Sequence, residues 1–143
     1  MRKKVEKIIT ISIGPDLEVY TLMRPSLEAV FIKAGLDENK ASMLFLAVEE
    51  VFSYCAKLLT ASKNKSWVDI SVGMDDSTLH IAIAHDGPCG SLEKYFIKGS
   101  DQKIKRTSFE ALGLYIAREI VNELEYRRFG GGKNEFVLVM NLP

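Results

Sequence analysis

The order of the hydrophobic periodicities constrains the fold of this chain more than any other feature. Apolar residues alternate in some segments, as in strands, and recur every three to four residues in others, as in helices. A single layer of helices over a mixed, largely antiparallel sheet follows from this order, so we expect an α+β fold. The expected strands cover 5–13, 67–72, 79–84, 126–129 and 136–142, and the expected helices cover 17–34, 38–59 and 109–124.

Local signals mark the boundaries of these segments. Asp16 and Asp37 are in place to cap the first two helices. Pro25 should kink the first helix or divide it, and Gly35 should end it. The glycine-rich segment 130–134 is expected to close a hairpin between the last two strands.

Composition limits the function classes that remain. The 143 residues, of which 47% are hydrophobic, predict a single domain over 1–143. The formal net charge of zero predicts no direct binding to nucleic acid or to an anionic membrane. No apolar run approaches the ~20 residues that span a bilayer. Two cysteines, Cys55 and Cys89, make no disulfide framework, and we expect a cytoplasmic protein.

Three motifs with chemistry-bearing residues follow one another along the chain. A helical segment over 44–55 contains a pair of glutamates, a glycine turn over 85–90 follows a strand, and Gly113 lies near the start of the last helix. Their order and spacing resemble the N, G1 and G2 boxes of the GHKL, or histidine kinase-like, ATPase superfamily. The resemblance covers nearly the whole chain and implies a two-layer α/β sandwich with helices on one face of the sheet.

The first box of that superfamily is Glu-x-x-x-Asn, whose two residues share a helix face. The resemblance implies that Glu50 is the catalytic base and that Tyr54 occupies the place of the Asn that binds Mg²⁺. A phenol oxygen is a poor ligand for this cation, so Mg²⁺ is expected to add little to nucleotide binding. A shift of one residue would pair Glu49 with Ser53 instead. An ordinary solvated helix face would explain the two glutamates about as well.

The second box is Asp-x-Gly-x-Gly, in which the Asp accepts the adenine amino proton. The resemblance places His85 at the Asp, Gly87 at the first glycine and Cys89 at the second. A neutral histidine accepts a hydrogen bond in only one tautomer and lacks the charge of a carboxylate, so Asp86 could take over adenine. His85, Asp86 and Gly87 are therefore the expected nucleotide-binding residues. The competing interpretation is a simple strand-ending Asp-Gly-Pro turn.

The third box is Gly-x-Gly before a helix whose first amides hold phosphates. Ala111 replaces the first glycine, and Gly113 matches the second, where it would make room for the nucleotide. The polar loop before this helix carries cations that could face phosphates or belong to a solvated surface: Lys98, Lys103, Lys105 and Arg106.

Within the superfamily, the chain most resembles bacterial anti-sigma factor serine/threonine kinases of the partner-switching type. The resemblance rests on Ala47-Val48-Glu49-Glu50 and on the tail from Leu112 to Leu142. Such kinases bind ATP and Mg²⁺, phosphorylate a small anti-anti-sigma (STAS-type) protein, hold a sigma factor and commonly form homodimers. The resemblance implies the same partners for this chain.

The substitutions decide how we interpret the resemblance. Together, Tyr54, His85, Cys89 and Ala111 predict a degraded ATP site, so we expect an anti-sigma factor-like regulator that binds ATP weakly or not at all. An active kinase with Glu50 as the base is the first alternative. The others are a non-catalytic binding module that uses the same surface and a nucleotide sensor that binds ATP without Mg²⁺-dependent transfer.

Overall fold

All five strands of the computed structural model, which describes residues 4–64, 66–105 and 107–143, belong to one sheet. The spatial order is β1-β2-β3-β5-β4, and each strand is antiparallel to its neighbours. A parallel bridge joins Ile97, which lies outside the strands, to Tyr126. The strands are β1 (Glu6–Ile13), β2 (Val68–Met74), β3 (Thr78–His85), β4 (Glu123–Arg128) and β5 (Asn134–Asn141).

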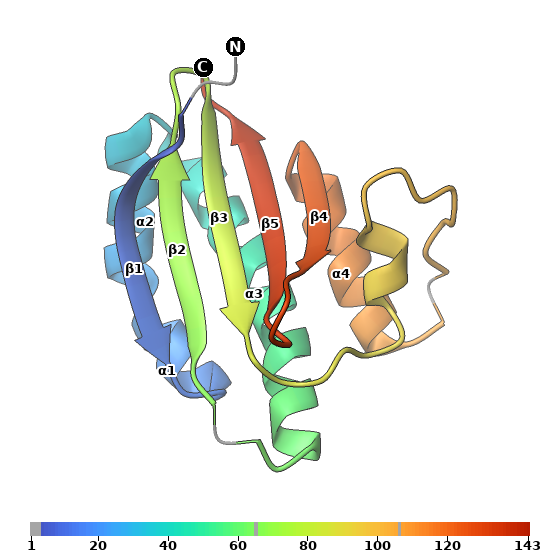
Figure 1. Ribbon diagram of the computed structural model, residues 1–143. Coiled ribbons are helices and arrows are strands. Elements are labelled where there is room, and N and C mark those ends of the chain that lie inside the picture. The colour runs from blue at the N-terminus through green and yellow to red at the C-terminus, as the bar shows by residue number, and fades with distance from the viewer. Residues whose placement is uncertain (1–3, 65, 106) are drawn as a thin grey trace.

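The α-helices cover one face of this sheet, and no helix of the described residues lies on the other face (Figure 1). This arrangement confirms the predicted two-layer sandwich. The helices are α1 (Leu17–Leu22), α2 (Arg24–Ala34), α3 (Glu38–Ala61) and α4 (Phe109–Ile120), and a short 3-10 helix, η1 (Glu93–Phe96), follows β3.

The predicted helix boundaries near the start of the chain are confirmed. The Asp16 side chain accepts a hydrogen bond from the Glu18 amide, and the Asp37 side chain accepts one from the Lys40 amide. Pro25 lies in the first turn of α2, so the predicted single helix is divided into α1 and α2. Gly35 ends α2 with a φ of 124°, a conformation that favours glycine.

The predicted end of the last helix is wrong by four residues. The helix ends at Ile120, and Leu124 lies in β4, opposite Leu138 of β5. The Asn122 side chain accepts the amide of Asn141, which fixes the chain as it turns into the sheet. Leu124 fits the apolar stripe of a helix as well as the inner face of a strand, and pairing with β5 decides between them.

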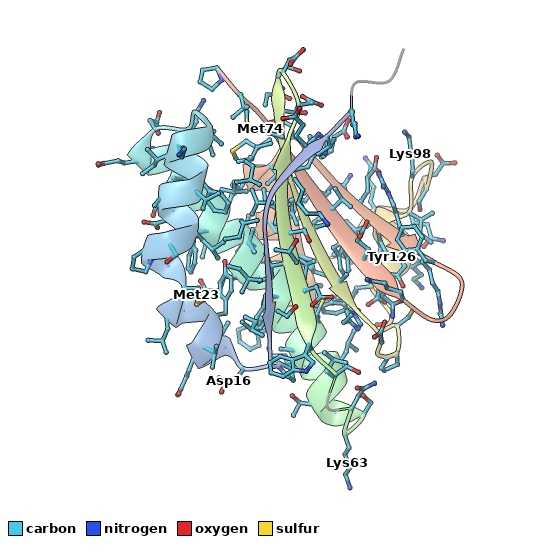
Figure 2. All side chains as sticks on the ribbon, turned by 60° about the vertical axis from the view of Figure 1, so that its left-hand side comes forward. Asp16, Met23, Lys63, Met74, Lys98 and Tyr126 are labelled. Carbon is cyan, nitrogen blue, oxygen red and sulfur yellow. The ribbon has the colours of Figure 1, made fainter. Side chains whose placement is uncertain are left out.

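Helix α3 forms the centre of the helical layer and is buried along most of its length. Side chains fill the space between this layer and the sheet (Figure 2). Tyr20 of α1 stacks on Phe45 and Phe52 of α3, with ring centroids 4.7 and 5.0 Å apart. This stacking holds α3 in a fixed position relative to α1. The side chains that α3 presents to the loop after β3 are therefore held in place as well.

The sheet register separates its two ends. Thr78 pairs with Asn141, and Glu6 pairs with Met74, so β1 begins and β5 ends at the same end of the sheet. His85 pairs with Asn134 at the opposite end. The predicted nucleotide residues of the turn after β3 therefore lie away from both chain ends (Figure 1).

Candidate functional site

Four segments meet beside the end of β3: the middle of α3, the turn over 86–90, η1 and the start of α4. The turn approaches α3 at Tyr54, and α4 approaches it at Glu50. The three motifs, although distant in sequence, are therefore neighbours along one face of α3.

Glu50 lies between α3 and α4. A Cβ atom added at Gly113 would collide with the Glu50 carboxyl, so glycine at this position allows α4 to pack closely against α3. Burial raises the pKa of Glu50, the neighbouring Glu49 raises it further, and Lys57 lowers it. A partly buried carboxyl with a raised pKa has the properties of a general base.

The alternative pair, Glu49 and Ser53, does not face the turn or α4. Glu49 lines a hollow beside Arg24 and Met43, and Ser53 lines a different hollow beside Leu17 and α3 residues. The geometry therefore favours Glu50 and Tyr54 as the residues at the N-box positions.

Tyr54 holds the loop that follows β3. Its hydroxyl accepts a hydrogen bond from the Leu92 amide at 3.3 Å, and it occupies the place that a Cβ atom at Gly90 would need. Its ring meets Phe136 edge-on, with centroids 6.0 Å apart. Burial, followed by the nearby Glu93, raises the pKa of Tyr54, so this phenol stays protonated.

His85 is buried at the end of β3 and is already hydrogen-bonded within its own turn. Its Nδ1 atom accepts the Gly87 amide at 3.1 Å. Burial lowers the pKa of His85, which favours the neutral ring. With Nδ1 as the acceptor, the ring proton is on Nε2, so His85 presents a donor rather than an acceptor to any ligand.

Asp86 and Gly87 have different surroundings from those of His85. Asp86 lines a hollow of about 360 Å³ together with Ser12, Trp67 and other residues, on the side of β1 and β2. A Cβ atom at Gly87 would collide with the Leu59 side chain of α3. Close packing against α3 is therefore sufficient to explain this glycine, whose predicted contact with nucleotide stays a prediction.

The start of α4 is capped by the chain itself. The Ser108 hydroxyl accepts the Ala111 amide at 3.1 Å, so this amide already has a partner. Lys98 lines a mixed-charge hollow with Arg118 and Glu123 rather than facing this helix end. Arg106 lies outside the described residues.

Sequence reasoning missed Asn134, which fastens the final hairpin to the turn after β3. Its buried amide donates to the Gly87 carbonyl at 2.5 Å and to the Gly132 carbonyl at 3.3 Å. The Tyr126 hydroxyl donates to its oxygen, and Cys89 contacts both groups. Asn134 is a polar residue in phase with Phe136 on the inner face of β5, and that pattern could have revealed it.

Glu93 was missed as well, and no periodicity distinguishes it in the sequence. It is 4% exposed, and its carboxyl lies within hydrogen-bonding reach of the Tyr54 hydroxyl. The carboxyl is close enough to Tyr54, His85 and Tyr126 to influence their pKa values. A buried carboxyl therefore lies against the Tyr54 hydroxyl among the residues of the candidate site.

This arrangement agrees with the comparison with protein families. Residues 13–140 match the model of the histidine kinase-like ATPase domain. The chain belongs to this family. Among the curated proteins, no sequence matches it.

A solved structure supports the fold of this histidine kinase-like ATPase domain. The crystal structure of the RsbU and RsbW domains of Rv1364c from Mycobacterium tuberculosis superposes with a TM-score of 0.64 at 14% sequence identity. The alignment covers 94% of this chain but only 33% of that one, so the present chain spans about a third of its length. Among the described residues of the present chain, none of the helices combines the length and apolarity needed to cross a membrane.

ATP is the ligand that the family description implies, and the residues of this histidine kinase-like ATPase domain do not fit it in the present arrangement. The Nδ1 atom of His85 is taken by the Gly87 amide, and the Ala111 amide is taken by Ser108. Tyr54 supplies a protonated phenol that binds the chain's own loop. ATP would require these contacts to be exchanged.

Proposed function

We propose that this chain is an anti-sigma factor-like regulatory protein of a bacterial partner-switching pathway. In this proposal it binds a sigma factor or a small STAS-type antagonist, and its ATP site is degraded. The family match supports the ATPase ancestry, and the likeness to a structure that contains an RsbW domain supports this branch. The observation that carries the proposal is the hydrogen bond between His85 and Gly87, because it removes the acceptor expected for adenine.

The exposed apolar side chains of the helical layer support a protein partner. Phe109, at the start of α4, is 88% exposed, and Leu22 of α1 is 77% exposed. A largely apolar hollow of about 370 Å³ lies beside Leu17, Ala56 and Ala61. Exposed apolar groups of this kind are common where proteins bind one another.

Calorimetric titration with ATP, with and without Mg²⁺, tests the degraded site. Each lost charge-assisted hydrogen bond is worth roughly 1.5–3 kcal/mol, which weakens binding by about tenfold or more. We expect weak or undetectable ATP binding and little effect of Mg²⁺. Tight binding that depends strongly on Mg²⁺ would contradict the proposal.

The alternative is an active protein serine kinase, and the position of Glu50 favours it. This carboxyl is partly buried beside α4 and has a raised pKa, as a general base requires. If phosphotransfer occurs, Glu50→Gln should lower its rate by about 10²–10⁴ while partner binding persists. Radiolabelled phosphate that appears on a STAS-type protein, and is lost in Glu50→Gln, would establish the kinase.

A two-hybrid screen against the sigma factors and STAS-type proteins of the source genome tests the partners. The proposal requires a cytoplasmic location, and expects binding to at least one member of these two classes. Light scattering of the purified chain tests the proposed homodimer. Reproducible binding to neither class would remove the partner-switching assignment.

A further inference from the structure

A hollow of about 360 Å³ lies where the end of β1, the start of β2 and the turn after β3 meet. Val68 and Ile70 are buried in the core, so Asp69 between them points to the face of the sheet opposite the helices. The Ser12 hydroxyl, from the paired position of β1, donates to the Asp69 carboxylate at 2.5 Å. The hollow is therefore on the other face of the sheet from the contacts of α3 and α4. The described residues that line it are Ser12, Ser66, Trp67, Asp69 and Asp86.

Trp67 is an aromatic residue that the fold leaves largely unburied. It directly precedes β2, and 64% of its surface is exposed beside the hollow. An exposed aromatic side chain forgoes the stabilisation that burial of its apolar surface would bring. Single exposed apolar residues are common, so Trp67 indicates a binding surface only in combination with the polar groups around it.

The polar groups beside Trp67 give the hollow a negative charge. Asp86 is exposed and Asp69 is half-buried, and neither forms an ion pair with another described residue. None of the described residues that line the hollow is a cation. A neutral occupant would take the two carboxylates out of water without compensating their charge, which is unfavourable. The charge therefore favours a cationic occupant.

Arginine is the cation that suits both the aromatic ring and the carboxylates. Its planar guanidinium stacks on the face of an indole ring, and its fork of N–H groups matches the oxygens of a carboxylate. The ammonium group of lysine can pair with a carboxylate but lacks the plane that stacks. Because Ser12, Trp67 and Asp86 are all exposed, a free guanidinium compound would make few contacts here, whereas a polypeptide adds contacts around its arginine.

We propose that this hollow is a docking site for an arginine side chain of a protein partner, in which the guanidinium stacks on Trp67 and pairs with Asp69 and Asp86. The inference goes beyond the proposed function, because it assigns a second contact surface on the face of the sheet away from the helical layer. It depends neither on the ATP site nor on the identity of the partner.

The chain contains a single tryptophan, so the indole N–H resonance of the full chain reports on this hollow alone. The probe is an acetylated and amidated peptide with one arginine between glycines. Its titration should shift the indole resonance saturably, and added salt should weaken the binding. A matched lysine peptide should bind about twofold to fivefold more weakly, because it loses the stacking. A matched citrulline peptide, which keeps the plane but carries no charge, should give no saturable shift.

Matched variants separate the hollow from the general surface charge. Asp69→Asn and Asp86→Asn should each weaken binding about twofold to fivefold, whereas Asp101→Asn, which removes an exposed carboxylate elsewhere, should not change it. Trp67→Leu should weaken binding about twofold to fivefold, measured by the anisotropy of a dye-labelled peptide. Phe129→Leu, at an aromatic residue that is 46% exposed, should leave the affinity unchanged.

Five results would overturn the docking site. They are no saturable shift with the arginine peptide, equal binding of the citrulline peptide, and unchanged affinity in both aspartate variants. In addition, free arginine that binds as tightly as the peptide would assign the hollow to a small molecule, and an equal shift with adenosine would assign it to a nucleobase. None of these results bears on the calorimetric and two-hybrid tests, so a failure here leaves the proposed function standing.

Discussion

At the scale of single residues, the neutral His85 ring determines what the turn after β3 can recognise. The sequence shows only that a histidine replaces the expected carboxylate. The acceptor role of Nδ1 depends on how the turn brings the Gly87 amide back toward the ring. Such a contact between residues two apart is set by backbone geometry, so the residue types alone did not predict it.

His85 should make stability depend on pH. Because burial lowers its pKa below the ordinary 6.5, the unfolded chain takes up a proton first as pH falls. The stabilisation is therefore complete above about pH 6.5 and is lost as pH falls toward the folded pKa. His85→Asn keeps an acceptor for Gly87 but does not titrate. Urea unfolding between pH 7.5 and 5 should show a steeper loss in the wild type, whereas parallel curves would contradict this interpretation.

Glu50 should have the opposite effect. Because its pKa is raised above the ordinary 4.5, the folded chain retains the proton to higher pH than the unfolded chain. The stabilisation from the protonated form is present below about pH 4.5 and is lost as pH rises through the folded pKa. Glu50→Gln should therefore raise the melting temperature at pH 7, and this gain should shrink toward pH 4.5. A lower melting temperature at pH 7 would show that the carboxylate is stabilising.

At the scale of elements, caps and breakers predicted boundaries well, whereas apolar spacing alone did not. Asp16 acts through its side chain on the next turn of backbone, and Pro25 and Gly35 act through their own backbone, so their effects could be predicted locally. Leu124 satisfies two periodicities at once, and only its pairing with Leu138 assigns it to β4. Boundary predictions are therefore wrong where pairing in the sheet, rather than the local sequence, decides between helix and strand.

Asn134 of β5 is hydrogen-bonded to the turn after β3, to the hairpin turn and to β4. Its replacement tests these connections. Asn134→Ala removes buried hydrogen bonds to Gly87, Gly132 and Tyr126. Each buried polar group left without a partner costs about 1–3 kcal/mol, so we expect a loss of roughly 2–4 kcal/mol in urea unfolding. Asn134→Asp should be at least as harmful, because a carboxylate would face two carbonyl oxygens. A loss below about 0.5 kcal/mol for both variants would contradict this role.

At the scale of the whole molecule, the sandwich and the neighbourhood of the three motifs could be predicted from the sequence. The order of the elements sufficed for the sandwich, because helices on one face of one sheet leave few arrangements, whereas the neighbourhood of the motifs was implied by the resemblance to histidine kinase-like ATPases. The contacts within the site could not be predicted in the same way. The position of Tyr54 against Gly90 and the burial of Glu93 depend on how the segment after β3 packs against α3.

The exposed start of α4 should affect partner binding without affecting folding. Phe109 is 88% exposed, so Phe109→Ser removes little buried surface and should change stability by less than about 0.5 kcal/mol. If this surface contacts the partner, affinity for the sigma factor or STAS-type protein should fall about tenfold or more. Thr107→Ser, also at an exposed position, serves as the control. Unchanged affinity in Phe109→Ser would place the interface elsewhere.

The sheet register also determines how this domain can be joined to other chains. Glu6 and Asn141 lie at one end of the sheet and His85 at the other, so a fusion at either terminus enters from the side away from the turn after β3. The two ends are separated by three strand spacings, or roughly 14 Å, which about five extended residues can bridge. Tags, tethered domains or a covalent circular closure can therefore be introduced there without covering the turn after β3.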